Sequence, residues 1–160
     1  GGIGMQIVDE ESQFASALKL CMSRAKSAFG DERVFVEKYI QGAQHVEFQV
    51  LADGKNAIHF GERFCSIQRR HQKLVEEGPW LSDEKRQEIG ALVCKGAESV
   101  GYKGLATFEF LRDANGDFYF LEVNPRVQVE HTVTELITGY NLVELGIRVA
   151  QGRGFTTVSV

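Results

Sequence analysis

The decapeptide Glu122-Val123-Asn124-Pro125-Arg126-Val127-Gln128-Val129-Glu130-His131 places a charged or amide side chain at every second position from its first glutamate to its last. The residues between them are valine and proline. Because side chains alternate between the two faces of an extended chain, this pattern predicts a strand with one polar face. That face would carry two carboxylates, two amides and a guanidinium, which could bind a metal ion, hold an anion and accept a proton.

A β-hairpin is predicted immediately before this stretch. Residues 105–111 form a strand candidate, and Asn115-Gly116 is the strongest short-range hairpin signal. If these two residues form the loop, the register places Glu109 opposite Glu122, with Cβ atoms about 4.5–5.5 Å apart. Two facing carboxylates repel each other unless a cation lies between them, and Mg²⁺ or Mn²⁺ suits oxygen ligands. The alternative is that both acids lie exposed on a wet sheet face.

Composition indicates one ordinary globular domain. The chain has 160 residues, of which 43% are hydrophobic and 25% are charged, and these values are typical of soluble proteins with a real core. The net charge of −4 argues against nucleic acid as the main partner. No apolar run approaches the roughly 18–20 residues of a membrane-spanning helix. We therefore expect neither a nucleic-acid partner nor a membrane location.

The cysteines and the start of the chain bear on its origin. Cys21, Cys65 and Cys94 have neither paired spacing nor a metal-site pattern, and no signal peptide is present, which indicates a reducing, intracellular compartment. The chain has no initiator methionine and opens with Gly1-Gly2-Ile3-Gly4-Met5. We interpret it as a piece of a longer protein, whose own targeting signals this sequence does not reveal.

Periodicity and turn residues predict three helices and several strands. The alternation of residues 44–52 puts Glu47 and Gln49 on a solvated strand face. Because hairpins dominate, we expect an α+β fold, with an antiparallel sheet and helices packed on one face. Predicted helices cover residues 9–29, 83–100 (capped by Ser82) and 133–150, with a possible interruption at Gly139; predicted strands cover 5–8, 33–40, 44–52, 57–64, 105–111 and 122–131; residues 65–80 form a predicted loop.

Three strings of sequence together resemble one known family. They are Glu37-Lys38-Tyr39-Ile40, Ser66-Ile67-Gln68-Arg69-Arg70-His71-Gln72-Lys73 and the decapeptide quoted above. They closely resemble the biotin carboxylase component of biotin-dependent carboxylases, which has the ATP-grasp fold. The resemblance extends to about Gly152 and implies a partial ATP-grasp domain: residues 1–53 in the small lobe, 54–152 in the catalytic lobe and 153–160 as a tail.

The resemblance also implies roles for individual residues. Glu130 matches the proposed general base, and Arg126 and Lys73 match catalytic residues that neutralise anions. Bicarbonate would be bound by Lys73, Arg126, Gln128 and the backbone of Val129, and the metal by Glu109, Glu122 and Asn124. ATP would be bound by Gly1, Gly2, Gly4, Glu37, Lys38, Ile40, His45, Gln68, His71, Glu109 and Glu122.

The implied activity is ATP- and bicarbonate-dependent carboxylation of biotin through carboxyphosphate, the first half-reaction of a biotin-dependent carboxylase. It would use ATP, Mg²⁺ or Mn²⁺, and biotin presented on a carrier protein. The implied partners are a biotin carboxyl carrier protein or domain, a carboxyltransferase and a second copy of the full domain. The implied location is the cytoplasm or the mitochondrion.

The sequence also departs from the family's pattern. It begins inside the glycine-rich loop, and the subdomains that flank this region in the family lie outside it. The segment of residues 76–82 also looks shorter than the family's loop. We therefore expect the isolated fragment to be inactive.

Other functions stay open at this stage. Urea carboxylase shares the first half-reaction, and carbamoyl-phosphate synthase shares the fold. A further alternative is a non-catalytic nucleotide-binding module, or a fragment that acts only through protein contacts.

Overall fold

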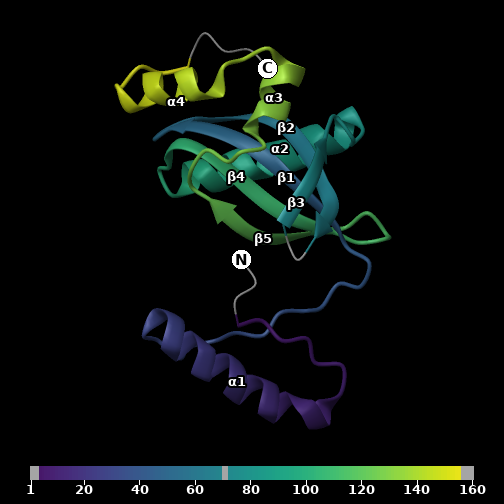
Figure 1. Cartoon of the computed structure of the whole chain (residues 1–160). Coiled ribbons are helices and arrows are strands. Elements are labelled where there is room, and N and C mark those ends of the chain that lie inside the picture. The colour runs from purple at the N-terminus through teal and green to yellow at the C-terminus, as the bar shows by residue number, and fades with distance from the viewer. Residues whose placement is uncertain (1–3, 70–71, 156–160) are drawn as a thin grey trace. The chain divides into compact units, whose positions relative to one another are not determined.

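The computed structural model describes residues 4–69 and 72–155 (Figure 1). The chain divides into two compact units, residues 1–41 and residues 42–160. Among the described residues, no helix combines the length and the apolar character that crossing a bilayer requires.

The first unit is built around helix α1, Glu11–Phe29. The helix ends as predicted at Gly30, which adopts φ 76° and donates its backbone N–H to the carbonyl oxygen of Lys26. Residues 5–8 and 33–40 are not strands, so these two predictions are wrong. Their apolar pattern fits a strand, but a strand also needs a neighbouring backbone to satisfy its N–H and C=O groups, and the described part of this unit offers none.

The second unit contains a five-stranded sheet in the order β3-β2-β1-β4-β5. The strands are β1 Gln44–Asp53, β2 Ala57–Arg69, β3 Gln72–Glu77, β4 Lys103–Arg112 and β5 Phe118–Asn124. Every neighbouring pair is antiparallel, which confirms the predicted sheet and the α+β class.

The predicted loop over residues 65–80 is wrong. Strand β2 continues to Arg69, and β3 pairs with it from Gln72 to Glu77. The register between these strands shifts after Phe64 and again after Ile67. Such irregularities interrupt the alternation of apolar and polar residues, which is the main periodic signal of a strand.

Helices cover both faces of the sheet, not the single face that we expected. On one face, Val46, Phe48, Val50 and Ala52 of β1 form a core with helix α2, Asp83–Ser99. On the other, Leu51 packs with residues of helix α4, Leu142–Ala150, and helix α3, His131–Thr138, contacts β2. Strand β1 is the middle strand, so its alternate side chains are buried on opposite sides.

Two helix boundaries follow the predictions. Ser82 caps α2, where its hydroxyl accepts a hydrogen bond from the backbone N–H of Lys85. The predicted interruption at Gly139 is confirmed, since this residue adopts φ 73° and separates α3 from α4.

In the β4–β5 hairpin Glu109 pairs with Glu122 as predicted, but the loop is longer than predicted. Arg112 pairs with Phe118, so the loop contains residues 113–117 and not Asn115-Gly116 alone. This longer loop would displace the register by one residue. An irregularity between Glu109 and Phe110 restores it, and Glu109 lies opposite Glu122 as predicted.

The predicted strand over residues 122–131 ends early. Strand β5 stops at Asn124, before Pro125, and α3 begins at His131. Proline has no N–H to continue a ladder. The residues between form no strand. There the polar Gln128 is 9% exposed and the apolar Val129 is 88% exposed.

Candidate functional site

A row of four charged residues crosses the sheet. Arg63 of β2 pairs with Glu47 of β1, Glu47 pairs with Glu109 of β4, and Glu109 pairs with Glu122 of β5. Side chains of directly paired residues share one face of a sheet. This is the face opposite α2, because the α2 face of β1 is taken by the even-numbered residues. Three acids and one arginine therefore lie side by side.

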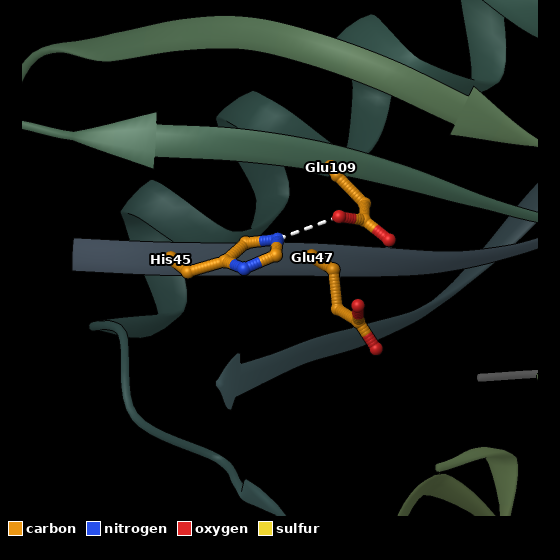
Figure 2. A group of neighbouring side chains, drawn as sticks. All are labelled: His45, Glu47 and Glu109. Atoms are coloured by element: carbon orange, nitrogen blue, oxygen red, sulfur yellow. Dashed lines mark ion pairs between the residues drawn. The ribbon is translucent and has the colours of Figure 1, made fainter. Parts of the chain in front are cut away.

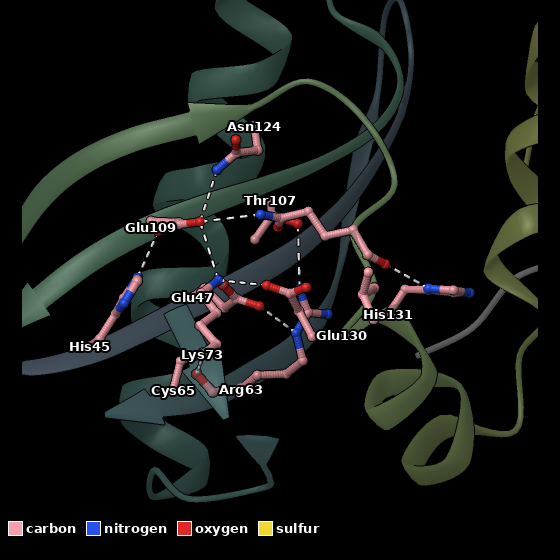
Figure 3. A network of polar contacts seen from close by, with 12 residues as sticks. His45, Glu47, Arg63, Cys65, Lys73, Thr107, Glu109, Asn124, Glu130 and His131 are labelled. Atoms are coloured by element: carbon pink, nitrogen blue, oxygen red, sulfur yellow. Dashed lines mark hydrogen bonds and ion pairs between the residues drawn. The ribbon is translucent and has the colours of Figure 1, made fainter. Parts of the chain in front are cut away.

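Lys73 of β3 contacts two acids of this row and also Glu130, which lies between β5 and α3 (Figure 3). Its Nζ atom forms ion pairs with Glu47 Oε2, with Glu109 Oε1 at 3.3 Å and with Glu130 Oε1 at 2.6 Å. Burial alone would lower the pKa of Lys73, but the charge of Glu47 and the bond to Glu130 outweigh it and raise that pKa. Lys73 is therefore held in its charged form.

Glu109 is the most extensively contacted of these acids. Its Oε2 atom lies 2.7 Å from His45 Nε2 (Figure 2). Its Oε1 atom accepts hydrogen bonds from Asn124 Nδ2 at 2.8 Å and from Gln128 Nε2 at 3.3 Å. Burial opposes ionisation, but the bond from His45 and the charge of Lys73 lower the pKa of Glu109 to about 2. The carboxylate is thus ionised at any physiological pH.

Glu130, the predicted general base, joins the same cluster. Burial alone would raise its pKa, but the hydrogen bond from Lys73 lowers it below the ordinary value. The structure thus brings Lys73, Glu109, Asn124, Gln128 and Glu130 together, although Glu130 lies beyond the end of β5.

Arg63, Glu47 and Gln49 are members of the cluster that sequence reasoning missed. Glu47 and Gln49 are completely buried, so the expectation of a solvated strand face is wrong. Arg63, also completely buried, binds Glu47 Oε1 at 2.5 Å and Gln49 Oε1 at 2.9 Å. The sequence held no local signal for this contact. The end of the hairpin pairs Ala52 with Ala57, a register that would place Arg63 opposite Val46, and the irregularity between Phe48 and Val50 moves it opposite Glu47.

The cluster suits a hard divalent cation. Asn124 Nδ2 lies 2.8 Å from Glu109 and 3.5 Å from Glu122 Oε1, so the three predicted metal ligands adjoin one another. Ligand atoms of His45, Glu47 and Glu109 also lie within 4.8 Å of one another. Carboxylate and amide oxygens are the ligands that Mg²⁺ and Mn²⁺ prefer.

Among the described residues of the second unit, Gln68 lies at the edge of this cluster and Arg126 lies outside it. Gln68 supports it through a 2.7 Å contact between its Nε2 atom and His45 Nδ1. The guanidinium of Arg126 is exposed and binds the carbonyl oxygen of Val127 at 3.2 Å. Gly4, Glu37, Lys38 and Ile40 belong to the first unit, and Gly1, Gly2 and His71 lie outside the described residues.

Comparison with known proteins assigns the family. Residues 1–158 match the family described as carbamoyl-phosphate synthase L chain, ATP binding domain. The chain belongs to this family. It is 50% identical over 155 residues to the biotin carboxylase of Allochromatium vinosum, covering 95% of this chain and 34% of that protein. It is 51% identical to the chloroplastic biotin carboxylase 1 of Populus trichocarpa, covering 95% of this chain and 29% of that protein.

Solved structures agree. The biotin carboxylase–β,γ-ATP complex of Campylobacter jejuni matches with a TM-score of 0.91 and 47% identity, covering 96% of this chain and 35% of that one. The biotin carboxylase domain dimer of Hydrogenobacter thermophilus 2-oxoglutarate carboxylase, in complex with MgADP, ADP and bicarbonate, matches with a TM-score of 0.89 and 46% identity, covering 96% and 34%.

These matches confirm the resemblance and the ATP-grasp fold. The chain is a biotin carboxylase-type ATP-grasp segment, and it spans about a third of the length of the curated relatives it matches.

Proposed function

We propose that this segment carries the phosphoryl-transfer centre of an ATP-dependent biotin carboxylase. The observation that carries the proposal is the position of Lys73 Nζ, in contact with Glu47, Glu109 and Glu130. Phosphoryl transfer from a nucleotide to an anionic substrate requires a cation close to a general base and to a metal ligand. Lys73 has this position relative to the candidate base and the candidate metal ligand. The similarity to proteins named biotin carboxylase gives the substrate class.

In the proposed reaction, Glu130 accepts the proton of bicarbonate while the bicarbonate oxygen attacks the γ-phosphorus of ATP. ADP leaves and carboxyphosphate forms. A base within hydrogen-bond reach of the transferred proton contributes roughly 10²–10⁴-fold to such a step. Carboxyphosphate then splits into CO₂ and phosphate. N1 of biotin bonds to the CO₂, and its proton passes to the released phosphate.

Positive side chains would hold the anions in this reaction. Lys73 and Arg126 neutralise bicarbonate and the phosphate region, and the planar guanidinium of Arg126 suits bidentate contact with a carboxylate. Gln128 and the backbone of Val129 complete the bicarbonate site. Lys73 contacts Oε1 of Glu130, so Oε2 would be the oxygen that accepts the proton.

Glu109, Glu122 and Asn124 would hold Mg²⁺ or Mn²⁺, which supplies charge neutralisation at the phosphate oxygens when bound. His45 and Gln68 would contact the nucleotide. The family resemblance implies nucleotide contacts also for Gly1, Gly2, Gly4, Glu37, Lys38, Ile40 and His71.

We further propose that the segment acts only within a longer protein and is inactive alone, since it spans about a third of its relatives. The partners would be a biotin carboxyl carrier, a carboxyltransferase and a second copy of the full domain; the Hydrogenobacter relative is described as a domain dimer. The setting would be intracellular, in the cytoplasm or an organelle such as the mitochondrion.

The test is bicarbonate-dependent ATP cleavage by the full-length enzyme that contains this segment, with free biotin and Mg²⁺. We expect cleavage that requires bicarbonate, rises with biotin and is lost in Glu130→Gln. Glu88→Gln, which alters an exposed acid of α2, should keep wild-type rates. Binding of ATP without bicarbonate-dependent cleavage would instead support a non-catalytic nucleotide-binding module. Further stimulation when urea is added as the final carboxyl acceptor would indicate urea carboxylase.

A further inference from the structure

Arg63 connects parts of the cluster that are far apart in the sequence. Its side chain is completely buried in β2. Its Nε atom donates to Glu47 Oε1 of β1 at 2.5 Å, and its Nη1 atom donates to Gln49 Oε1 at 2.9 Å and to Thr134 Oγ1 of α3 at 2.8 Å. It has no role among the predicted catalytic or binding residues.

The two oxygens of Glu47 have different partners. Oε1 accepts from Arg63, and Oε2 accepts from Lys73. Arg63 contacts Glu47 through Nε alone, while Nη1 of the same planar group binds Gln49 and Thr134, so the guanidinium holds Oε1 at a fixed place. The contact with Arg63 therefore sets the direction in which Oε2 points toward Lys73.

The contact with Thr134 has a second consequence. Thr134 is 2% exposed and lies in the first turn of α3, four residues after Glu130. Glu130 immediately precedes this helix. Anchoring the hydroxyl of Thr134 to the sheet thus fixes the position of the helix start, and with it the carboxylate of Glu130.

We propose that Arg63 is a positioning residue that sets the placement of Lys73. Its guanidinium holds Glu47 on one side and the start of α3 on the other, so that Lys73 Nζ stays between the carboxylates of Glu47 and Glu130. The catalytic consequence rests on the proposed function of Lys73 and Glu130, whereas the placement of Lys73 itself does not.

The test removes the Thr134 hydroxyl, which accepts a hydrogen bond from Arg63, and leaves the buried arginine unchanged. Thr134→Val has the same shape but lacks the hydroxyl, and Thr134→Ser keeps it. Thr138→Val, in the same helix but outside the contacts of Arg63, is the control. In the full-length enzyme we expect kcat for bicarbonate-dependent ATP cleavage to fall about tenfold in Thr134→Val, consistent with losing one hydrogen bond to a charged group. KM for ATP should change less than twofold, and Thr134→Ser should restore kcat.

A second measurement does not depend on activity. The rate at which acetic anhydride labels Lys73 in the folded protein reports how firmly the amine is held. Labelling is followed by mass spectrometry, with exposed Lys95 as the internal reference. We expect labelling several-fold faster in Thr134→Val than in wild type, Thr134→Ser or Thr138→Val.

Unchanged labelling of Lys73 in Thr134→Val would overturn the proposal, as would equal loss of kcat in Thr138→Val. A change in labelling without any bicarbonate-dependent cleavage by the wild type would support the positioning role and reject the proposed function.

Discussion

Glu47 and Glu109 are directly paired across β1 and β4, although both are buried carboxylates. Facing like charges destabilise a sheet unless cations compensate them. Here Lys73 contacts both acids and Arg63 contacts Glu47. The pair therefore depends on side chains from β2 and β3, and it concentrates charge where the proposed phosphoryl transfer takes place.

Replacing Lys73 with glutamine should move the acid limb of the pH–activity profile to higher pH. Lys73 lowers the pKa of Glu130, and burial alone would raise it. A general base must be deprotonated, so without Lys73 activity should begin to fall at a higher pH as the solution is acidified. The measurement is residual bicarbonate-dependent ATP cleavage between pH 5 and 9. An acid limb that stays in place would show that Lys73 does not control Glu130.

Replacing Glu122 with glutamine should raise the Mg²⁺ concentration needed for half-maximal activity about tenfold or more. The change removes one charged oxygen ligand from the proposed metal site, and each 1.4 kcal/mol lost is tenfold in affinity. A titration of activity against free Mg²⁺ checks this. Glu144→Gln, at an exposed acid of α4, should leave the titration unchanged, and an equal shift in both variants would contradict the assignment.

The chain should lose stability as the pH rises through the range in which Glu76 titrates. Burial raises the pKa of Glu76 from 4.5 to about 7, so the folded state binds a proton more tightly than the unfolded state. Its contribution is therefore fully present below about pH 4.5 and is lost as the pH rises through 7. Allowing for partial solvent screening, we expect the free energy of unfolding to fall by roughly 1–2 kcal/mol over this pH range because of Glu76.

Urea unfolding of the 160-residue chain at pH 5 and at pH 8, compared between wild type and Glu76→Gln, isolates this contribution. The variant should show a smaller loss between the two pH values. Equal losses in the two proteins would assign the pH dependence to other groups.

Glu62 and Asp83 should contribute differently to the free energy of unfolding, although both bind Arg86. The side chain of Glu62 is completely buried and accepts from Arg86 Nε at 2.7 Å and from the backbone N–H of Trp80 at 2.8 Å, whereas that of Asp83 is 95% exposed. Glu62→Gln should lower the free energy of unfolding by about 2–4 kcal/mol, because it breaks the buried pair and leaves Arg86 with only the exposed carboxylate of Asp83. Asp83→Asn should cost less than about 1 kcal/mol. Similar losses in denaturant unfolding would refute this distinction.

Much of the fold follows from local sequence. The alternation of residues 44–52 predicts β1, Ser82 marks the start of α2, and glycine at 30 and 139 marks helix ends. Each of these signals acts within a few residues, through side-chain periodicity, a capping hydroxyl or a positive φ. The facing of Glu109 and Glu122 was also predicted, although by a two-residue loop and not by the longer loop with its compensating irregularity.

The sequence by itself determined the family, through its three strings, and the acids of the β4–β5 hairpin. Only the tertiary structure decided that Glu47 is buried against Arg63, that residues 72–77 form an edge strand carrying Lys73, and that Glu130 reaches this cluster from beyond the end of β5. The reason is physical. A charged residue on a strand face has the same local pattern whether water or a buried arginine covers it, and strand pairing and helix packing, acting between residues far apart in sequence, decide between the two.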